Sequence, residues 1–341
     1  MITFKVGILG AGSIAAKIAD CLNGLSGFSA YAIASRDKEK AEAFKEEHNC
    51  EKAYGSYLEL IQDPAVELVY IATVNSTHAE LAKLCLENGK HCLVEKPFSY
   101  NSTTTREVLE LAKEKNLFAG EALWTRYMPL TLQLQQLIKS NVIGQVRHMT
   151  ANLGYDLHTK ERLIKPEYAG GALLDLGIYP IAMILTVMGM LPASVASATT
   201  LMNTGVDAVD VVQMNFSNAR SASMMVTMTY KSDNRAVVYG THGRIEIDNV
   251  NCPETITVFG PDGEPLTPIK KPEKQQSGYE YQFIAARETI ITGKNDTPEH
   301  AKSDIMAISS FMEMLRRSFK VVFPLPGEPK KEELEQQFKP V

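Results

Sequence analysis

A glycine-rich turn near the start of the chain restricts the fold more than any other feature. Gly10-Ala11-Gly12-Ser13-Ile14-Ala15 follows an apolar run at 5–9 and precedes a segment with helical spacing. The pattern G-x-G-x-x-A between a strand and a helix is the dinucleotide-binding fingerprint, with alanine at the third glycine position. Gly10 is expected to form the tight turn and Gly12 to let the backbone approach a pyrophosphate at the helix start. An ordinary glycine-rich turn is the alternative.

Short apolar runs alternate with helical segments along the first third of the chain. The predicted strands are 5–9, 30–34, 68–73, 91–94 and 118–122, and the predicted helices are 13–22, 38–48, 78–88 and 102–115. Such alternation is typical of βαβ units, which build a parallel sheet with helices on both faces. The fold class predicted for this part is α/β, a Rossmann domain with a doubly wound parallel sheet.

The pattern changes after about Trp124. Helices are expected at 130–140, 172–188, 279–291 and 298–319, and strands at 194–200, 209–216, 221–230, 236–239 and 255–259. Runs of strands after a few helices predict an α+β domain with a large, mostly antiparallel open sheet. Because 341 residues are enough for two domains, we expect a Rossmann domain at 1–123, a second domain at 124–330 and an exposed tail at 331–341.

The end of the second predicted strand bears on the choice between NAD and NADP. An acidic residue at this place binds the ribose 2′-hydroxyl of NAD, whereas this chain has Ser35-Arg36-Asp37. A serine hydroxyl and a guanidinium suit a 2′-phosphate, and Asp37 can instead begin the next helix. NADP is therefore predicted in preference to NAD. The alternative is that Arg36 is a surface charge that stacks on the adenine.

Two further segments carry groups suited to proton transfer. Lys96 follows a predicted strand, at the edge where parallel sheets bind ligands, although a lysine there is often only a solvated charge. Asp175 and Tyr179 are spaced i and i+4 in an apolar segment, so a helix would place both on one face. A buried tyrosine bonded to an aspartate is the alternative for this pair.

Four segments together resemble the glucose–fructose oxidoreductase / inositol dehydrogenase (Gfo/Idh/MocA) family across the whole chain. They are the Gly10 turn, Thr73-Val74-Asn75-Ser76-Thr77-His78, Glu95-Lys96-Pro97 and the segment from Gly170 to Tyr179. The segments Glu121-Ala122-Leu123-Trp124-Thr125-Arg126 and 173–180 are similar to the dimeric dihydrodiol dehydrogenase-like branch. That branch has tyrosine at the position of Tyr179, where many other relatives have histidine.

The resemblance implies a role for each matched residue. Lys96 and Tyr179 match the catalytic pair, with Asp175 as substrate or acid–base support. The residues implied to bind the cofactor are Gly10, Ala11, Gly12, Ser13, Ile14, Ser35, Arg36, Thr73, Val74, Asn75, His78, Glu95, Lys96, Trp124 and Arg126. Those implied to border the substrate are Trp124, Arg162, Asp175 and Tyr179. The open sheet of the second domain is implied to form a homodimer or a higher homo-oligomer.

The activity implied is hydride transfer between NADP and a small-molecule substrate, a carbohydrate-like or cyclic hydroxyl or ketone such as a sugar, polyol or dihydrodiol. Tyr179 is the expected general acid or base. The pKa of a free tyrosine is about 10, so a neighbouring Lys96 ammonium is expected to lower it. Two other functions of the same fold stay open, an NAD-dependent glycoside hydrolase and a non-catalytic NADP-sensing regulator.

Composition argues against several other classes of function. The net charge is −5 and no basic block occurs, so neither nucleic acid nor an anionic membrane is an expected partner. The uncharged stretch 176–206 is interrupted by Pro180, Gly189 and Pro192, which favours a core helix over a membrane span. The 5 cysteines and 7 histidines form no metal-binding or disulfide pattern, and the first residues do not resemble a secretory signal. We therefore expect no metal and a reducing, cytoplasmic location.

Overall fold

The computed structural model describes residues 3–337 and divides into two compact units. The first unit is Met1–Trp124 with Gln276–Met306, and the second is Thr125–Gln275 with Ala307–Val341. The boundary between the two units at Trp124 lies next to the one expected at 123. The continuous range 124–330 does not describe the second unit, because Gln276–Met306 returns to the first and contributes Phe283 and Ala286 to its core.

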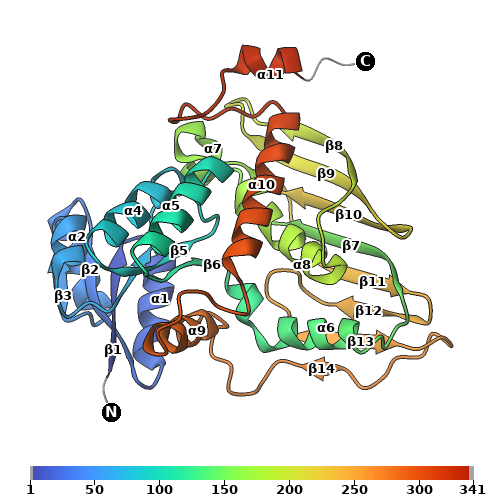
Figure 1. The fold of residues 1–341 in the computed structure, drawn as a ribbon, viewed down its shortest axis with the longest axis horizontal. Coiled ribbons are helices and arrows are strands. Elements are labelled where there is room, and N and C mark those ends of the chain that lie inside the picture. The colour runs from blue at the N-terminus through green and yellow to red at the C-terminus, as the bar shows by residue number, and fades with distance from the viewer. Residues whose placement is uncertain (1–2, 338–341) are drawn as a thin grey trace. The chain divides into compact units, whose positions relative to one another are not determined.

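The first unit is built on a six-stranded parallel sheet in the order β3-β2-β1-β4-β5-β6 (Figure 1). Its strands are β1 (Phe4–Leu9), β2 (Phe28–Ala34), β3 (Lys52–Tyr54), β4 (Leu68–Ile71), β5 (His91–Glu95) and β6 (Ala119–Ala122). Neighbouring strands pair in parallel throughout, which confirms the predicted doubly wound sheet. Only β3, a three-residue edge strand, was not predicted.

Helices cover both faces of this sheet. They are α1 (Ser13–Gly24), α2 (Lys38–Glu47), α3 (Tyr57–Gln62), α4 (His78–Glu87), α5 (Ser102–Glu114) and α9 (Glu280–Ile291), with the start of α10 (Lys302–Ser318). One core cluster joins the sheet to α3, α4 and α5, and the other joins it to α1 and α9. Since strands buried on both faces must be apolar, the continuous apolar runs in the sequence mark them.

The order of the strands reverses direction between β1 and β4. Parallel sheets bind ligands at the carboxyl ends of the strands, in the crevice where the order reverses. The Gly10 turn follows β1, and the loop that begins at Thr73 follows β4. Two segments predicted to bind the cofactor therefore lie at this point.

The second unit contains an eight-stranded sheet in the order β14-β13-β12-β11-β7-β10-β9-β8. Its strands are β7 (Val146–Gly154), β8 (Ser194–Leu201), β9 (Asp207–Phe216), β10 (Arg220–Thr227), β11 (Ala236–Gly240), β12 (Gly243–Ile247), β13 (Thr255–Phe259) and β14 (Ile269–Lys270). Only β7 and β10 pair in parallel, so the sheet is mostly antiparallel as predicted. The strands β7, β12 and β14 were not predicted, although β7 lies in the middle of the sheet.

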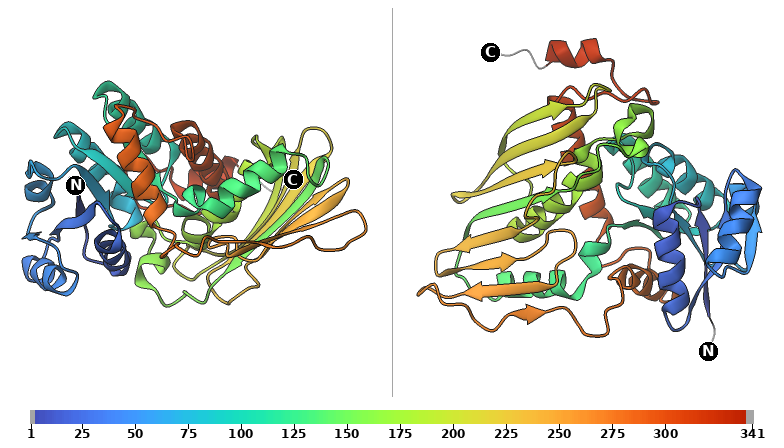
Figure 2. Two further views of the ribbon diagram at one scale, coloured as in Figure 1. Left: turned by 90° about the horizontal axis from the view of Figure 1, so that it is seen from below. Right: turned by 180° about the vertical axis from the view of Figure 1, so that it is seen from behind.

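Helices lie against one face of this sheet and leave the other exposed (Figure 2). The helices of the unit are α6 (Pro129–Lys139), α7 (Glu161–Ile164), α8 (Ile178–Met188), the end of α10 and α11 (Lys331–Gln337). Alternate residues of β9 from Val211 onward are exposed, while those between them are buried. This period of two is typical of a strand with one face in the core. In the tail expected to be exposed, Leu334 is instead buried, and 338–341 lie outside the described residues.

One stretch of the described residues, Pro166–Met188, is long and apolar enough to cross a membrane by length and composition alone. Within its most apolar window, 89% of the residues are buried inside the protein. It includes the π-helical turn Leu173–Gly177 and α8. The burial agrees with the core helix expected from the sequence.

Candidate active site

The Gly10 turn has the geometry that a dinucleotide requires. Gly10 has a φ of +97°, and a Cβ there would lie 2.7 Å from the carbonyl oxygen of Ala72, so only glycine fits. Gly12 is the N-cap of α1, and a Cβ there would meet no atom within 4 Å. No side chain caps α1 and no acidic residue lies in its first turn, which begins at Ser13 and Ile14. The N–H groups at the start of the helix are therefore available to an anion.

The carboxyl end of β2 presents a hydroxyl and a guanidinium. Asp37 is the N-cap of α2, and its side chain accepts a hydrogen bond from the Lys40 N–H at 3.2 Å. The Ser35 hydroxyl accepts one from the Asp37 N–H at 3.2 Å. Arg36 is exposed and has no hydrogen-bond or ion-pair partner among residues 3–337. As the sequence suggested, Asp37 begins a helix, and the Arg36 side chain before it is exposed.

The loop after β4 joins the strand end to α4. Thr73 and Val74 are half-buried and Asn75 is buried. His78 is fully buried, with Nδ1 2.8 Å from the Pro97 carbonyl oxygen and Nε2 3.2 Å from that of Thr73. Burial lowers the pKa of His78, so the ring is neutral and donates to one carbonyl only. His78 stays a predicted member of the cofactor loop, and in the structure its buried ring joins two loops of the site.

Lys96 lies at the carboxyl end of β5, in a turn whose backbone N–H groups are hydrogen-bonded to buried carboxylates. Glu95 accepts hydrogen bonds from the Tyr70 hydroxyl and from the Lys96 N–H, the second at 3.0 Å. The Lys96–Pro97 peptide is cis, and the Lys96 side chain is half-buried. Glu95 is itself buried, and its carboxylate holds the backbone of Lys96.

The first unit also holds the Trp124 side chain in a fixed orientation. Its ring stacks on Tyr279 with the centroids 4.4 Å apart and the planes inclined by 34°. Tyr279 precedes α9, in the segment that returns to this unit. The sequence offered no sign of this partner, which is 155 positions away (279 − 124).

In the second unit, Asp175 and Arg162 bind each other. Arg162 donates from Nη1 to Oδ1 at 2.9 Å and from Nη2 to Oδ2 at 3.4 Å. Asp175 is buried, while the Arg162 side chain is 51% exposed. Two residues that were each implied to contact substrate thus form a bidentate pair, which compensates the burial of the carboxylate.

Tyr179 lies one turn beyond Asp175, where a π-helical turn passes into α8. The π-helical turn is Leu173–Gly177, and Tyr179 is buried in the first turn of α8. Such turns are rare and frequently occur at functional sites. Arg126, which was implied to border the nicotinamide, is buried and donates to the Thr186 hydroxyl in α8.

Two buried carboxyl groups lie at the start of the π-helical turn. Asp207 accepts a hydrogen bond from the Leu173 N–H at 2.5 Å, and Asp210 accepts one from the Thr199 hydroxyl at 2.7 Å. Gly171 has a φ of +111°, and a Cβ there would lie 2.2 Å from Asp207 Oδ1. Burial raises the pKa of both carboxyl groups, and the charge of Asp207 raises that of Asp210 further. This pair was not predicted, because no motif distinguishes the residues of β9 from those of an ordinary strand.

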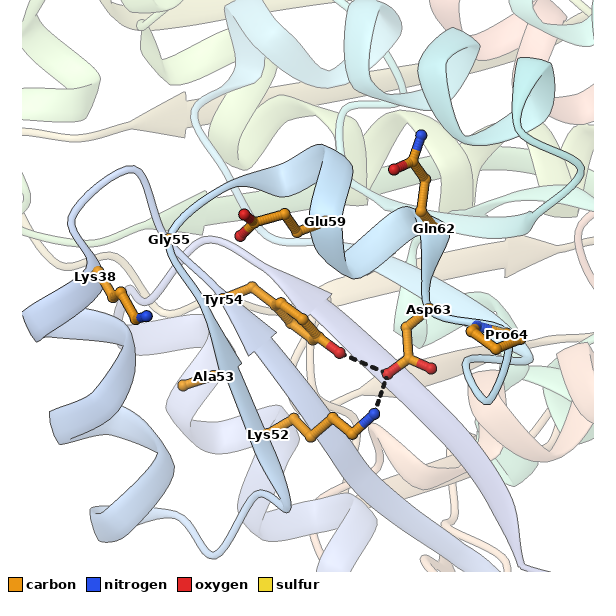
Figure 3. Close-up of a pocket in the computed structure, with 9 residues that line it drawn as sticks. All are labelled: Lys38, Lys52, Ala53, Tyr54, Gly55, Glu59, Gln62, Asp63 and Pro64. Carbon is orange, nitrogen blue, oxygen red and sulfur yellow. Dashed lines mark hydrogen bonds and ion pairs between the residues drawn. The ribbon is translucent and has the colours of Figure 1, made fainter.

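A cavity of about 560 Å³ lies elsewhere in the first unit, beside the edge strand β3 (Figure 3). Its lining residues are Lys38, Lys52, Ala53, Tyr54, Gly55, Glu59, Gln62, Asp63 and Pro64. Lys52 and Tyr54 both point to the Asp63 carboxylate, at 2.9 and 2.7 Å. These polar groups satisfy one another, and none of the predicted site residues lines the cavity.

Among residues 3–337, no group of three or more His, Cys, Asp or Glu could hold a metal ion.

Comparison with known proteins gives the same fold and a family. Residues 4–122 match the model described as "Oxidoreductase family, NAD-binding Rossmann fold", and residues 131–246 match the GFO/IDH/MocA C-terminal domain. Among solved structures, an aldose–aldose oxidoreductase from Caulobacter crescentus has a TM-score of 0.84 at 20% identity, covering 93% of this chain and 98% of its own. A 3-ketoreductase from Actinomadura kijaniata has a TM-score of 0.81 at 22% identity, covering 92% and 97%.

Curated proteins are similar over almost the whole chain. The trans-1,2-dihydrobenzene-1,2-diol dehydrogenase of Xenopus tropicalis is 32% identical over 94% of this chain and 99% of its own. The human protein of the same name is 32% identical over 93% of this chain and 97% of its own. The chain therefore belongs to the Gfo/Idh/MocA family of oxidoreductases, and it is a dehydrogenase or reductase that acts on hydroxyl groups.

Proposed function

We propose that the protein is an NADP-dependent oxidoreductase that transfers a hydride between the nicotinamide and a carbohydrate-like or cyclic hydroxyl or ketone. The observation that carries the substrate class is the similarity, at 32% identity, to trans-dihydrodiol dehydrogenases over at least 93% of the chain. A dihydrodiol, a polyol and a sugar all present a secondary hydroxyl on a ring or chain, so all three belong in the test.

The residues of the first unit fit NADP. The uncapped start of α1 suits a pyrophosphate, because free N–H groups and the helix dipole favour negative charge there. Ser35 and the unpartnered Arg36 suit a 2′-phosphate, since a guanidinium binds phosphate in a bidentate way. Bound NADP would supply the nicotinamide carbon that exchanges the hydride.

The remaining chemistry is proton transfer at the substrate oxygen, and we assign it to Tyr179. A phenol with an ordinary pKa of about 10 is a poor base at neutral pH. A nearby ammonium lowers the pKa of the phenol, because an opposite charge favours the ionised form. Lys96 is the residue that we assign to this task. Asp175, which Arg162 holds in a fixed orientation, would accept a hydrogen bond from a substrate hydroxyl.

A substrate panel tests the proposal. The protein is mixed with NADP or NAD and offered trans-1,2-dihydrobenzene-1,2-diol, polyols and sugars, and absorbance of the reduced nicotinamide is followed. Formation of NADPH with one or more of these compounds, faster than formation of NADH, is the expected result. Tight binding of NADP without turnover of any member in either direction would contradict an enzymatic role. Release of sugar from glycosides without net reduction would indicate a hydrolase instead.

We also propose that the protein forms a homodimer through the open face of the eight-stranded sheet. The register of β9, β10 and β7 aligns Val211 with Met225 and Met225 with Asn152, so these three lie on one face. Val211 is 51% exposed in the described structure. Burying such a face against a second copy would remove apolar surface from water.

The five cysteines support a reducing location such as the cytoplasm. All five are free thiols, and all except Cys252 are buried. Burial raises the pKa of Cys21 and of Cys50 to about 11, so both thiols are protonated at neutral pH. Protonated buried thiols are unreactive and behave as small apolar side chains.

A further inference from the structure

Three buried side chains bind the backbone of the turn Lys96–Pro97–Phe98, called here the Lys96 turn. Glu95 accepts from the Lys96 N–H at 3.0 Å, and Glu121 accepts from the Phe98 N–H at 2.7 Å. Because proline has no N–H, these two carboxylates satisfy every backbone donor of the turn. The third side chain, His78, lies 2.8 Å from the Pro97 carbonyl oxygen.

Glu121 is in turn bound by a residue from a distant part of the chain. Its second oxygen is 2.6 Å from Nε2 of His300, and both residues are only 1% exposed. His300 lies between α9 and α10, in the segment Gln276–Met306 that returns to the first unit. Both oxygens of the Glu121 carboxylate are therefore bound, and one of them binds the Lys96 turn.

Stability alone does not require this arrangement. Taking a carboxylate and an imidazole out of water is costly, and well-packed apolar side chains in place of buried polar pairs are often as stable or more stable. β6 is otherwise a buried apolar strand, and Glu121 pairs across the sheet with Val94, just before the turn. Glu121 thus lies near the carboxyl edge of the sheet, where parallel sheets bind ligands.

We infer that Glu121 and His300 are positioning residues, which orient Lys96 for catalysis by holding the Phe98 N–H. This inference rests on the proposed function of Lys96. The Lys96 side chain leaves the backbone at the first residue of the turn, so a displaced turn moves its ammonium. A displacement of about 1 Å at a reacting group can lower turnover about 100-fold. Cofactor affinity should change little, because neither side chain has exposed surface to offer a ligand.

The first measurement is backbone hydrogen exchange of the whole protein. Glu121→Leu removes both hydrogen bonds, whereas Glu121→Gln keeps an oxygen for the Phe98 N–H. We expect exchange at the Lys96 and Phe98 amides to be at least 10-fold faster in Glu121→Leu and within about 3-fold of wild type in Glu121→Gln. His300→Asn replaces the imidazole that binds Glu121 with a shorter side chain, so its exchange rates should lie between those of the two Glu121 variants. This variant replaces Glu121→Leu in the test if Glu121→Leu does not fold. Unchanged exchange in both Glu121→Leu and His300→Asn would overturn the inference, with or without turnover.

The second measurement separates turnover from binding, with trans-1,2-dihydrobenzene-1,2-diol and NADP as probes. We expect kcat to fall about 10- to 100-fold in Glu121→Leu and to recover largely in Glu121→Gln, with the Kd for NADP within 3-fold throughout. Asp63→Asn, which disturbs a buried carboxylate beside β3, is the matched control and should leave kcat unchanged. Equal losses of kcat in Asp63→Asn and Glu121→Leu would mean a general loss of stability and would overturn the positioning role.

Lys96→Met distinguishes failure of this inference from failure of the proposed function. Wild-type turnover in Lys96→Met would overturn the proposed role of the lysine itself. Loss of turnover in Lys96→Met together with wild-type turnover in Glu121→Leu would leave that role intact and overturn only the positioning by Glu121 and His300.

Discussion

A buried carboxylate such as Asp175 is stable only where donors replace its lost hydration. Arg162 supplies two of them, and because its side chain is half-exposed, the pair extends from the interior to the surface of the second unit. Asp175 is thereby fixed one turn from Tyr179, at the π-helical turn that precedes α8. Arg36 differs from this pair, because its guanidinium is exposed and suits a ligand.

Tyr179→Phe tests the proton-transfer role. We expect kcat to fall about 10²- to 10⁴-fold, the usual contribution of a positioned acid or base, while the Kd for NADP stays within about 2-fold. Tyr155→Phe is the matched control, because it removes the 2.9 Å hydrogen bond to Asn251 in the same unit. Steady-state kinetics and cofactor titration measure both variants. Wild-type kcat in Tyr179→Phe would remove this residue from the mechanism.

Arg36→Ala tests the choice of cofactor. Loss of a charge-assisted hydrogen bond costs about 1.5–3 kcal/mol, so the KM for NADP should rise about 10- to 100-fold. The KM for NAD should hardly change, since NAD carries no 2′-phosphate. Lys45→Ala, a half-buried cation of α2 that is paired with Glu42, controls for a general change of charge near this site. Equal effects on the two cofactors would contradict recognition of the phosphate by Arg36.

The π-helical turn shows how one element depends on another. Its first N–H, from Leu173, donates to Asp207 in β9, so the strand supports the segment that carries Asp175. Asp207 and Asp210 are both buried, and two negative charges so close cannot both persist. Burial raises the pKa of both groups and the charge of Asp207 raises that of Asp210 further, so the pair is expected to hold a proton.

Asp210→Asn should stabilise the protein at neutral pH. Burial and the charge of Asp207 raise the pKa of Asp210 above its unfolded value of about 3.9. The folded state therefore binds more protons than the unfolded state, and stability falls as pH rises above about 4. Asparagine keeps an acceptor for Thr199 and adds a donor toward Asp207. The free energy of unfolding of the variant should therefore fall less as pH rises. The groups that face the pair are Thr199, the Leu173 N–H and Arg316, whose charge opposes the rise for Asp207.

Urea unfolding at pH 5 and pH 8 measures this effect. We expect the free energy of unfolding of Asp210→Asn to exceed that of wild type by about 1–2 kcal/mol at pH 8, one pKa unit being worth 1.36 kcal/mol. The excess should be smaller at pH 5. Asp63→Asn should change the free energy of unfolding in the opposite direction. Burial opposes ionisation of Asp63, but Lys52, Tyr54 and the Ala65 N–H hold its pKa below the usual value. Its charged form therefore stabilises the protein at neutral pH and its loss should destabilise. Destabilisation by both variants at pH 8 would contradict a proton held by the pair of Asp207 and Asp210.

For the molecule as a whole, the two units differ in how they expose their sheets. The parallel sheet has a core cluster on each face. The antiparallel sheet is apolar on one face and presents alternating side chains, Val211 and Tyr239 among them, on the other. A face of this kind suits association with another chain.

Val211→Lys combined with Met225→Lys should convert the proposed dimer into a monomer. Two ammonium groups on each copy would have to lose their hydration and would repel their counterparts. Light scattering after gel filtration measures the mass. Ile291→Lys, at a 64% exposed position of α9 in the first unit, should leave the dimer intact. A wild-type protein that is monomeric at micromolar concentration, or a double variant that stays dimeric, would contradict this interface.

The sequence by itself determined the Rossmann unit and most helices and strands, because hydrophobic periodicity and glycine turns are local. Gly10, Gly12 and Asp37 take the local conformations expected of them. The middle strand β7 was missed, although Met149, Ala151 and Leu153 are buried at every second position, as in a strand with one face in the core.

Only the tertiary structure decided which distant residues meet. Glu121 and His300 are 179 positions apart, and Gln276–Met306 joins the first unit after the chain has formed most of the second unit. His78 and Glu95 were predicted to lie at the site, yet the fold buries them behind the backbone that they hold. Such contacts depend on strand order and helix packing, which no local pattern encodes.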